Sequence, residues 1–116
     1  MVDRVIIMVL DGFGVGEAPD ANKYGDEGSN TLAGIYNNTS LDIPNMAKLG
    51  LYNIDGVKVG EKQEKTIGVY GKAQEQADGK NSPVGHWEMS GYIKHPAFTT
   101  YPNAFPKKLI DEFIEK

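Results

Sequence analysis

The longest continuous apolar stretch of the chain lies near its start, over residues 5–10 (VIIMVL). Every position in it is apolar, a pattern typical of strands that are covered on both faces in a parallel sheet. The run DGFGVG follows at once at residues 11–16, and its three glycines allow a sharp turn. We therefore predict a central first strand ending in a turn, at the sheet edge where open α/β folds place ligands.

The first half of the chain also carries the signals of two short helices. Ser29 or Asn30 can cap a helix over residues 31–36, because a short polar side chain there accepts a hydrogen bond from a free backbone N–H. Pro44 suits the first position of a second helix, and Gly50 suits the residue beyond its end. We predict a short helix at each place.

One further strand and one further helix are expected in the second half. Residues 66–73 (TIGVYGKA) alternate in part between apolar and polar positions, as a strand does, and a polar turn follows them. Ser82 as cap and Pro83 at the first position predict a helix that runs towards Ser90, and Gly91 would stop it.

The last residues of the chain are amphipathic. After Pro106, apolar residues recur at the spacing of one helix face. No glycine, asparagine or proline follows them to end the helix, so we expect these 116 residues to be a piece of a longer protein. The apolar face consists of Leu109, Ile110, Phe113 and Ile114.

Composition narrows the fold and function classes. With 40% hydrophobic residues the chain should fold, and 116 residues suffice for one domain, here expected to be incomplete. The 12 basic and 16 acidic residues are spread along the chain, so no basic stripe is available to bind nucleic acid. The absence of cysteine excludes a disulfide framework and a thiolate metal site. The apolar start is too short for a membrane span or a signal peptide core, so a cytoplasmic protein is expected.

Asp11 is the first residue to which chemistry can be assigned. A carboxylate that directly follows a buried parallel strand lies at the carboxyl edge of the sheet, and the neighbouring glycines leave room for a cation. Aspartate is also favoured in turns because its side chain forms hydrogen bonds with the local backbone. Metal or phosphate chemistry and a purely local role both remain open.

A second group of candidates lies in the run NSPVGH at residues 81–86. Backbone N–H groups and the helix dipole favour an anion at a helix N-terminus, so a phosphoryl group carried on Ser82 would be stabilised there. A serine hydroxyl is a poor nucleophile unless a base or a metal ion activates it, and Ser82 could instead only cap the helix. His86 comes about one helical turn later, as either an acid–base group or a structural residue.

Beyond these patterns, the sequence resembles the phosphopentomutase family of the alkaline phosphatase superfamily over nearly its whole length. Several matching strings are unusual, and all occur in the same order. The motif LDGFG is the least specific, because it occurs across the wider superfamily. The strings are VIIMVLDGFGVGEAPDA (5–21), YGDEGSNTL (24–32), IPNMAKLGL (43–51), GHWEMSG (85–91) and YPNAFPKKLIDEF (101–113).

The resemblance implies an α/β fold, the alkaline-phosphatase-like three-layer sandwich with a mostly parallel sheet. Residues 1–116 would form the N-terminal part of its metal-binding phosphotransfer core domain. The inserted cap domain, the C-terminal part of the core and most of the metal ligands would lie beyond residue 116. The isolated chain is therefore expected to be nearly inactive.

The resemblance also implies roles for the candidate residues. The family's aspartate that ligates one of two manganese ions falls on Asp11. The family's phosphorylated threonine falls on Ser82, also a metal ligand, with Asn81, Gly85 and His86 as the frame around the phosphate. The family run reads Asp-Thr-x-Thr-Gly-His-Trp-Glu, so Asn81 and Ser82 depart from it. They are similar instead to the nucleophile motif of cofactor-independent phosphoglycerate mutase, whose phosphorylated residue is a serine.

The function implied is that of an isomerase of nucleotide metabolism. It would interconvert ribose or deoxyribose 1-phosphate and 5-phosphate through a phosphorylated hydroxyl and two Mn²⁺ ions. Its partner would be a small sugar phosphate, with no nucleic acid or membrane involved. One alternative is a phosphoglycerate-mutase-like enzyme or a metal-dependent phosphatase of the same superfamily. Another is a non-catalytic remnant that self-associates through the apolar face at residues 109–114.

Overall fold

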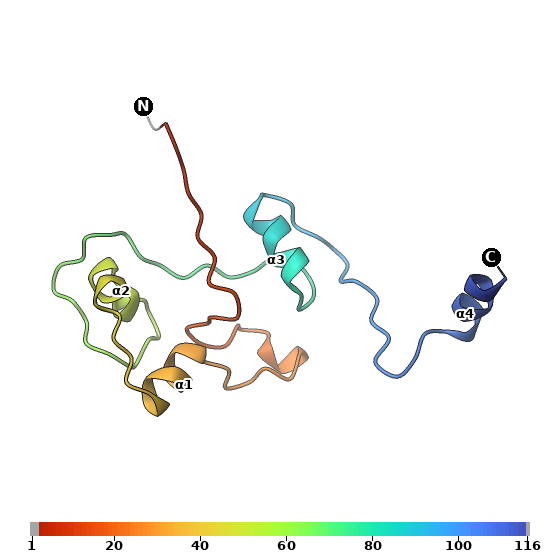
Figure 1. Ribbon diagram of the computed structural model, residues 1–116, viewed down its shortest axis with the longest axis horizontal. Coiled ribbons are helices and arrows are strands. Elements are labelled where there is room, and N and C mark those ends of the chain that lie inside the picture. The colour runs from red at the N-terminus through yellow and green to blue at the C-terminus, as the bar shows by residue number, and fades with distance from the viewer. Residues whose placement is uncertain (1–2, 116) are drawn as a thin grey trace. The chain divides into compact units, whose positions relative to one another are not determined.

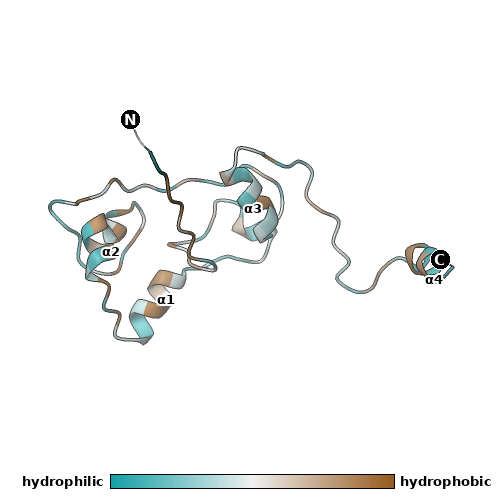
Figure 2. Cartoon of the chain, turned by 45° about the horizontal axis from the view of Figure 1, so that its top comes forward, coloured by the Kyte–Doolittle hydropathy of each residue, from teal (hydrophilic) through white to brown (hydrophobic). Residues whose placement is uncertain are grey.

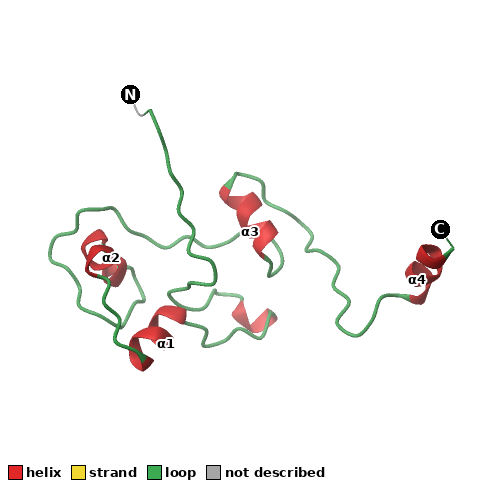
Figure 3. Ribbon diagram, viewed as in Figure 1, coloured by secondary structure: helices red, strands yellow, loops and turns green. Residues whose placement is uncertain are grey.

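The computed structural model describes residues 3–115, which divide into two compact units. The first unit is Met1–Gln74 and the second is Glu75–Lys116, and each is described by itself. Helices are the regular elements within the described residues (Figure 3). In chain order they are the short 3₁₀ helix η1 (Ala21–Lys23), α1 (Thr31–Asn38), α2 (Pro44–Leu49), the 3₁₀ helix η2 (Leu51–Asn53), α3 (Ser82–Met89) and α4 (Lys107–Ile114), labelled in part in Figure 1.

Helix α1 begins where the sequence predicts it and extends two residues beyond the predicted end. Of the two candidate caps, Asn30 takes the role, because its Oδ1 accepts a hydrogen bond from the Ala33 N–H at 2.9 Å. The first turn of α1 also holds the glycine-rich turn that follows residues 5–10. Thr31 Oγ1 donates to the Gly12 carbonyl at 3.0 Å, and the Leu32 N–H donates to the Gly14 carbonyl at 3.0 Å.

Helix α2 confirms the predicted start at Pro44 and the predicted end before Gly50. Gly50 has φ of +106°, a left-handed conformation that glycine adopts without strain. A Cβ at this position would lie 2.3 Å from Cδ1 of Tyr70, so glycine is also required by packing. The chain continues directly into η2, and the two helices form one tight corner.

A small apolar core lies in the first unit. Leu32 of α1 is 1% exposed and is buried together with Leu51, Tyr52 and Val57. Tyr36 of α1 contacts Tyr52 edge to face, with ring centroids 6.1 Å apart. This core joins α1 to the corner formed by α2 and η2. Partly buried residues that pack against it are Phe13, Val15, Leu41, Ile43, Met46, Ala47, Ile54 and Val59.

Neither predicted strand is formed among the described residues. Residues 5–10 are extended but exposed, from 47% at Val9 to 83% at Met8. Figure 2 shows this brown, apolar segment running without a neighbouring strand. A strand needs a second strand to pair its backbone N–H and C=O groups, and none lies beside this one within residues 3–115. Residues 66–73 likewise form no strand. The α/β fold class stays a prediction.

The second unit contains α3, α4 and a cluster of aromatic rings. Trp87 contacts Tyr92 and Phe98 edge to face, with centroids 5.8 and 5.7 Å apart, and Lys94 Nζ lies 4.6 Å from the centre of the Phe98 ring. The rings remain partly exposed, and Val84 of α3 is the fully buried side chain of this unit among the described residues. Among residues 3–115, no helix combines the length and the apolar character needed to cross a membrane.

Candidate functional site

Ser82 is the first residue of α3, and the structure corrects its predicted role as the cap. The cap is Asn81, whose Oδ1 accepts a hydrogen bond from the Val84 N–H at 3.0 Å. Asparagine caps helices as well as serine does, and with Asn81 as cap Pro83 takes the second helical position, where its missing N–H costs nothing. Ser82 is exposed, and its hydroxyl makes no hydrogen bond with the described residues. The interpretation of Ser82 as a mere helix cap is therefore wrong.

The first turn of α3 provides an electrostatic environment for an anion, but few donors. The helix dipole places partial positive charge near Ser82. Pro83 has no N–H, the Val84 N–H is taken by Asn81, and the Gly85 N–H contacts the Asn81 carbonyl at 3.3 Å. A phosphoryl group on Ser82 would thus need further positive charge from outside this turn.

His86 contacts the backbone of Ser82. Its Nδ1 lies 2.8 Å from the Ser82 carbonyl oxygen, one helical turn earlier. A carbonyl oxygen only accepts hydrogen bonds, so Nδ1 must carry the proton, and in the neutral ring Nε2 is then the acceptor. The contact fixes the ring to the helix next to Ser82, with the carbonyl rather than the hydroxyl as its partner.

Gly85 lies on the same turn without a steric requirement for glycine. A Cβ there would come no closer than 3.8 Å to its nearest neighbour, Glu75 Oε1, and Gly85 does not have a positive φ. Gly85 therefore lies in the first half of α3, next to His86, and no contact among the described residues requires a glycine there.

Asp11 lies in the turn that closes residues 5–10, in the first unit, whereas Ser82 belongs to the second. The turn is closed by a hydrogen bond from the Phe13 N–H to the Leu10 carbonyl at 3.3 Å, and Gly12 has φ of +68°. The Asp11 carboxylate is exposed and has no hydrogen bond or ion pair with the described residues. Its side chain is not needed to form the turn, and it is available to bind a ligand.

Asp11 and Ser82 carry oxygen atoms that suit a divalent metal ion, but two side chains are too few to form a metal site. A carboxylate oxygen and a hydroxyl oxygen suit hard cations such as Mn²⁺. Within residues 3–115, no group of three or more histidine, aspartate or glutamate side chains could hold a metal ion. Asp11 and Ser82 would each need ligands that the described residues do not supply.

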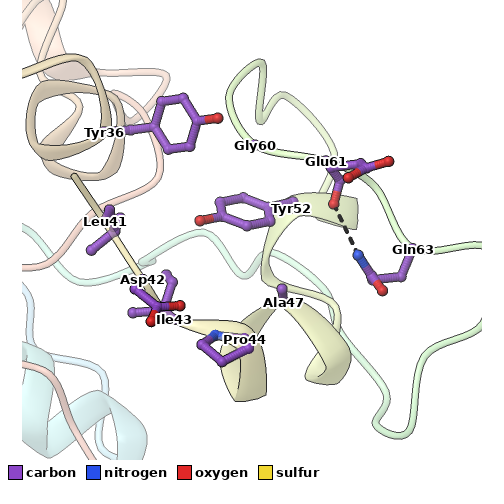
Figure 4. A pocket seen from close by; sticks show the side chains of 10 residues that line it. All are labelled: Tyr36, Leu41, Asp42, Ile43, Pro44, Ala47, Tyr52, Gly60, Glu61 and Gln63. Carbon is purple, nitrogen blue, oxygen red and sulfur yellow. Dashed lines mark hydrogen bonds between the residues drawn. The ribbon is translucent and has the colours of Figure 1, made fainter. Parts of the chain in front are cut away.

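A hollow of about 260 Å³ opens on the first unit beside Tyr36 and Tyr52 (Figure 4). One wall is held rigid, because the Asn53 side chain exchanges two hydrogen bonds with the backbone of Gln63, at 2.8 and 2.9 Å. Its two carboxylates, Asp42 and Glu61, lie at opposite sides of the hollow in Figure 4 and do not converge. Neither predicted metal ligand lines it, and we assign it no ligand.

Glu88 was not predicted as a site residue. It lies on α3, six positions after Ser82, and its two carboxylate oxygens accept hydrogen bonds from the N–H groups of Gln76 and Ala77, each at 2.8 Å. The sequence could not reveal this contact. A side chain that binds the backbone of a distant segment produces no periodic pattern of apolar and polar residues. The loop it holds is the one that leads into Asn81 and Ser82.

Curated relatives about 50% identical to this chain carry the name phosphopentomutase. The chain is 51% identical over its whole length to a protein named phosphopentomutase from Clostridium acetobutylicum and covers 30% of that protein. It is 49% identical over its whole length to the phosphopentomutase of Caldanaerobacter subterraneus, again covering 30%. It is 49% identical over 95% of its length to that of Thermotoga maritima, covering 28%. No family model matches the chain. The resemblance predicted from the sequence is confirmed, and the chain spans about 30% of the length of these curated relatives.

Proposed function

We propose that the protein containing this chain is a phosphopentomutase that interconverts ribose or deoxyribose 1-phosphate and 5-phosphate, with Ser82 as the phosphate carrier. The observation that carries the proposal is the Ser82 hydroxyl, which is exposed at the first residue of α3 and free because Asn81 caps the helix. The relatives at about 50% identity, all named phosphopentomutase, support the choice of reaction.

The proposed reaction is an exchange of one phosphoryl group between oxygens. In each half-reaction the bond from phosphorus to one oxygen forms as the bond to another breaks, and Ser82 Oγ is one of the two. When Ser82 Oγ attacks, its proton is released to solvent, and the sugar oxygen that departs from phosphorus takes up a proton. The dipole of α3 stabilises the negative charge that the phosphoryl group brings to Ser82. His86 holds the Ser82 carbonyl, and Asn81 fixes the start of the helix.

Two Mn²⁺ ions are part of the proposal. Asp11 and Ser82 would each supply one oxygen ligand, and the other ligands would come from residues outside this chain. Such ions, when bound, neutralise phosphoryl charge and lower the pKa of an attacking oxygen. Because these ligands are not among the described residues, we propose that residues 1–116 alone are nearly inactive. We also propose a cytoplasmic enzyme whose full core is an α/β sandwich containing residues 5–10 as a strand.

The test is the Ser82→Ala substitution in the complete protein. It should abolish mutase turnover and leave the protein folded, because the hydroxyl makes no structural hydrogen bond with the described residues. Ser90→Ala is the matched control at the other end of α3, directly after its last residue, since the Ser90 hydroxyl only donates to the His86 carbonyl at 3.1 Å. Retained mutase activity in Ser82→Ala would contradict the proposal. Assays with phosphoglycerate and a generic phosphomonoester separate it from the related mutase and phosphatase activities.

Self-association is a second candidate function, favoured by α4. Its apolar face is exposed, with Phe113 at 82%. The helix has two lysines in its first turn and Asp111 and Glu112 in its last turn, the reverse of what the helix dipole favours, and each lysine lies near the acidic residue four positions later. An antiparallel second copy of α4 would place its acidic end beside the basic end of the first, so that the charges of the two helices would be complementary. The apolar face of Leu109, Ile110, Phe113 and Ile114 would then be the dimer contact.

A further inference from the structure

Glu88 closes a loop around the proposed phosphate carrier. Its Oε1 accepts a hydrogen bond from the Gln76 N–H and its Oε2 from the Ala77 N–H, both at 2.8 Å. Hydrogen bonds to an ionised carboxylate are shorter and stronger than those between neutral groups. The bond from Ala77 is partly buried, so water competes less for it than for the exposed bond from Gln76. The carboxylate therefore fastens residues 76–77 to the last turn of α3.

Ser82 belongs to the chain segment between Ala77 and Glu88, whose two ends are joined by the hydrogen bonds of Glu88. A few residues join Ala77 to Ser82, and α3 joins Ser82 to Glu88. The last residue before the helix, Asn81, is fixed in turn by its cap bond to Val84. With both the start of the loop and the start of the helix held, the Ser82 backbone has little freedom to shift relative to α3.

Residues 94 and 95 provide a second attachment for the same loop. The Asp78 N–H donates to the Lys94 carbonyl at 3.1 Å, and the Asp78 carboxylate lies 2.8 Å from Nδ1 of His95. Both members of that ion pair are more than half exposed, so it contributes little by itself. Glu88 is the charged group on α3 itself that holds the loop.

We propose that Glu88 is a positioning residue, which fixes the loop from Gln76 to Asn81 against α3 and thereby sets the direction of the Ser82 hydroxyl. This inference rests on the proposed role of Ser82 as phosphate carrier. Phosphoryl transfer requires the attacking and leaving oxygens to be in line, and misplacing a reacting atom by about 1 Å costs about 100-fold in rate. Both Glu88 oxygens act as acceptors, so glutamine cannot replace it: its amide group would face a backbone N–H, and two donors would meet.

The test is Glu88→Gln in the complete protein, measured as a separate kcat and KM. We expect kcat to fall about 10- to 100-fold and KM to change by less than about 2-fold, because the substrate is still bound but the hydroxyl is misaligned. Glu64→Gln is the matched control: Glu64 is exposed and makes no hydrogen bond or ion pair with the described residues. Its kcat should equal that of the unmodified protein.

Rescue separates positioning from a merely structural role. Glu88→Asp keeps two acceptor oxygens on a shorter side chain, so its kcat should lie between those of Glu88→Gln and the unmodified protein. A kcat in Glu88→Gln equal to that of the control would overturn the inference, as would a loss confined to KM. If Glu88→Gln does not fold, Glu88→Asp provides the same kcat and KM comparison, and hydrogen exchange on the unmodified protein shows whether the Gln76 and Ala77 amides are protected. Rapid exchange of both amides would also overturn it.

The same experiments distinguish this inference from the proposed function. If Ser82→Ala is active, Ser82 is not the carrier and both proposals fail together. If Ser82→Ala is inactive and Glu88→Gln turns over at the full rate, Ser82 keeps its role and the proposal for Glu88 alone is lost.

Discussion

The Asn81 side-chain oxygen accepts a hydrogen bond from the Val84 N–H at 3.0 Å, and this bond decides what the neighbouring serine can do. A helix start needs one capping side chain, and Asn81 provides it. The hydroxyl of Ser82 is then free at the positive end of the helix dipole. The proposed role of Ser82 in phosphoryl transfer therefore depends on Asn81 being the cap of α3.

Removing the cap should destabilise α3. We expect Asn81→Ala to lower the free energy of unfolding by about 1 kcal/mol, because one backbone N–H loses its partner. Asn81→Asp should keep the cap, and its negative charge should add about 0.5 kcal/mol at the helix N-terminus. Denaturant unfolding of the complete protein measures both. Asn37→Ala, on the exposed surface of α1, is the control and should not destabilise. An Asn81→Ala protein as stable as this control would show that the cap does not form.

The corner between α2 and η2 should depend on Gly50. Gly50→Ala is expected to cost about 2 kcal/mol or more, because alanine is strained at φ of +106° and its Cβ would clash with the Tyr70 ring. Gly34→Ala is the matched control, since Gly34 lies within α1 and a Cβ there meets nothing within 4 Å. It should stabilise the protein by up to about 1 kcal/mol. Equal effects of the two substitutions in urea unfolding would contradict the described corner.

Most of the helical structure could be predicted because its signals are local. Pro44 and Gly50 mark the two ends of α2 within a few residues of chain, and the structure has the helix there. The cap of α3 was predicted wrongly as Ser82. Asn81 is an equally good cap, and the backbone conformation, which the sequence does not show, puts Asn81 in that position.

The predicted strands and the role of Glu88 depend on partners that are distant in sequence. The apolar pattern of residues 5–10 indicates that both faces of this segment would be buried in a sheet. A strand also needs a neighbouring strand to pair with, and none is present within residues 3–115. Glu88 contacts backbone groups that any residue type provides, so its partners could not be read from the sequence. Asp11 could be placed in its turn from the neighbouring glycines, whereas its predicted role as a metal ligand has no support from other side chains: within residues 3–115 no group of three or more histidine, aspartate or glutamate side chains could hold a metal ion.

The exposed face of α4 gives a prediction on assembly. If a second copy covers it, Phe113→Asp should shift the complete protein from dimer to monomer, because a charge would be buried in the apolar contact. Glu64→Gln, at an exposed position outside α4, should leave the dimer intact. Sedimentation or light scattering over a range of concentrations measures the change. A complete protein that is already monomeric at high concentration would contradict self-association through α4.

The most direct test of the central claim is to look for the phosphate on Ser82. The complete protein is incubated with Mn²⁺ and a ribose phosphate labelled on phosphorus, quenched, and digested, and the peptide that contains residues 81–90 is examined by mass spectrometry. We predict a labelled phosphoserine at Ser82 that is lost again when unlabelled substrate is added, and no label on Ser90. A protein that turns over the substrate while Ser82 stays unmodified, or while Ser82→Ala is equally active, would contradict the account.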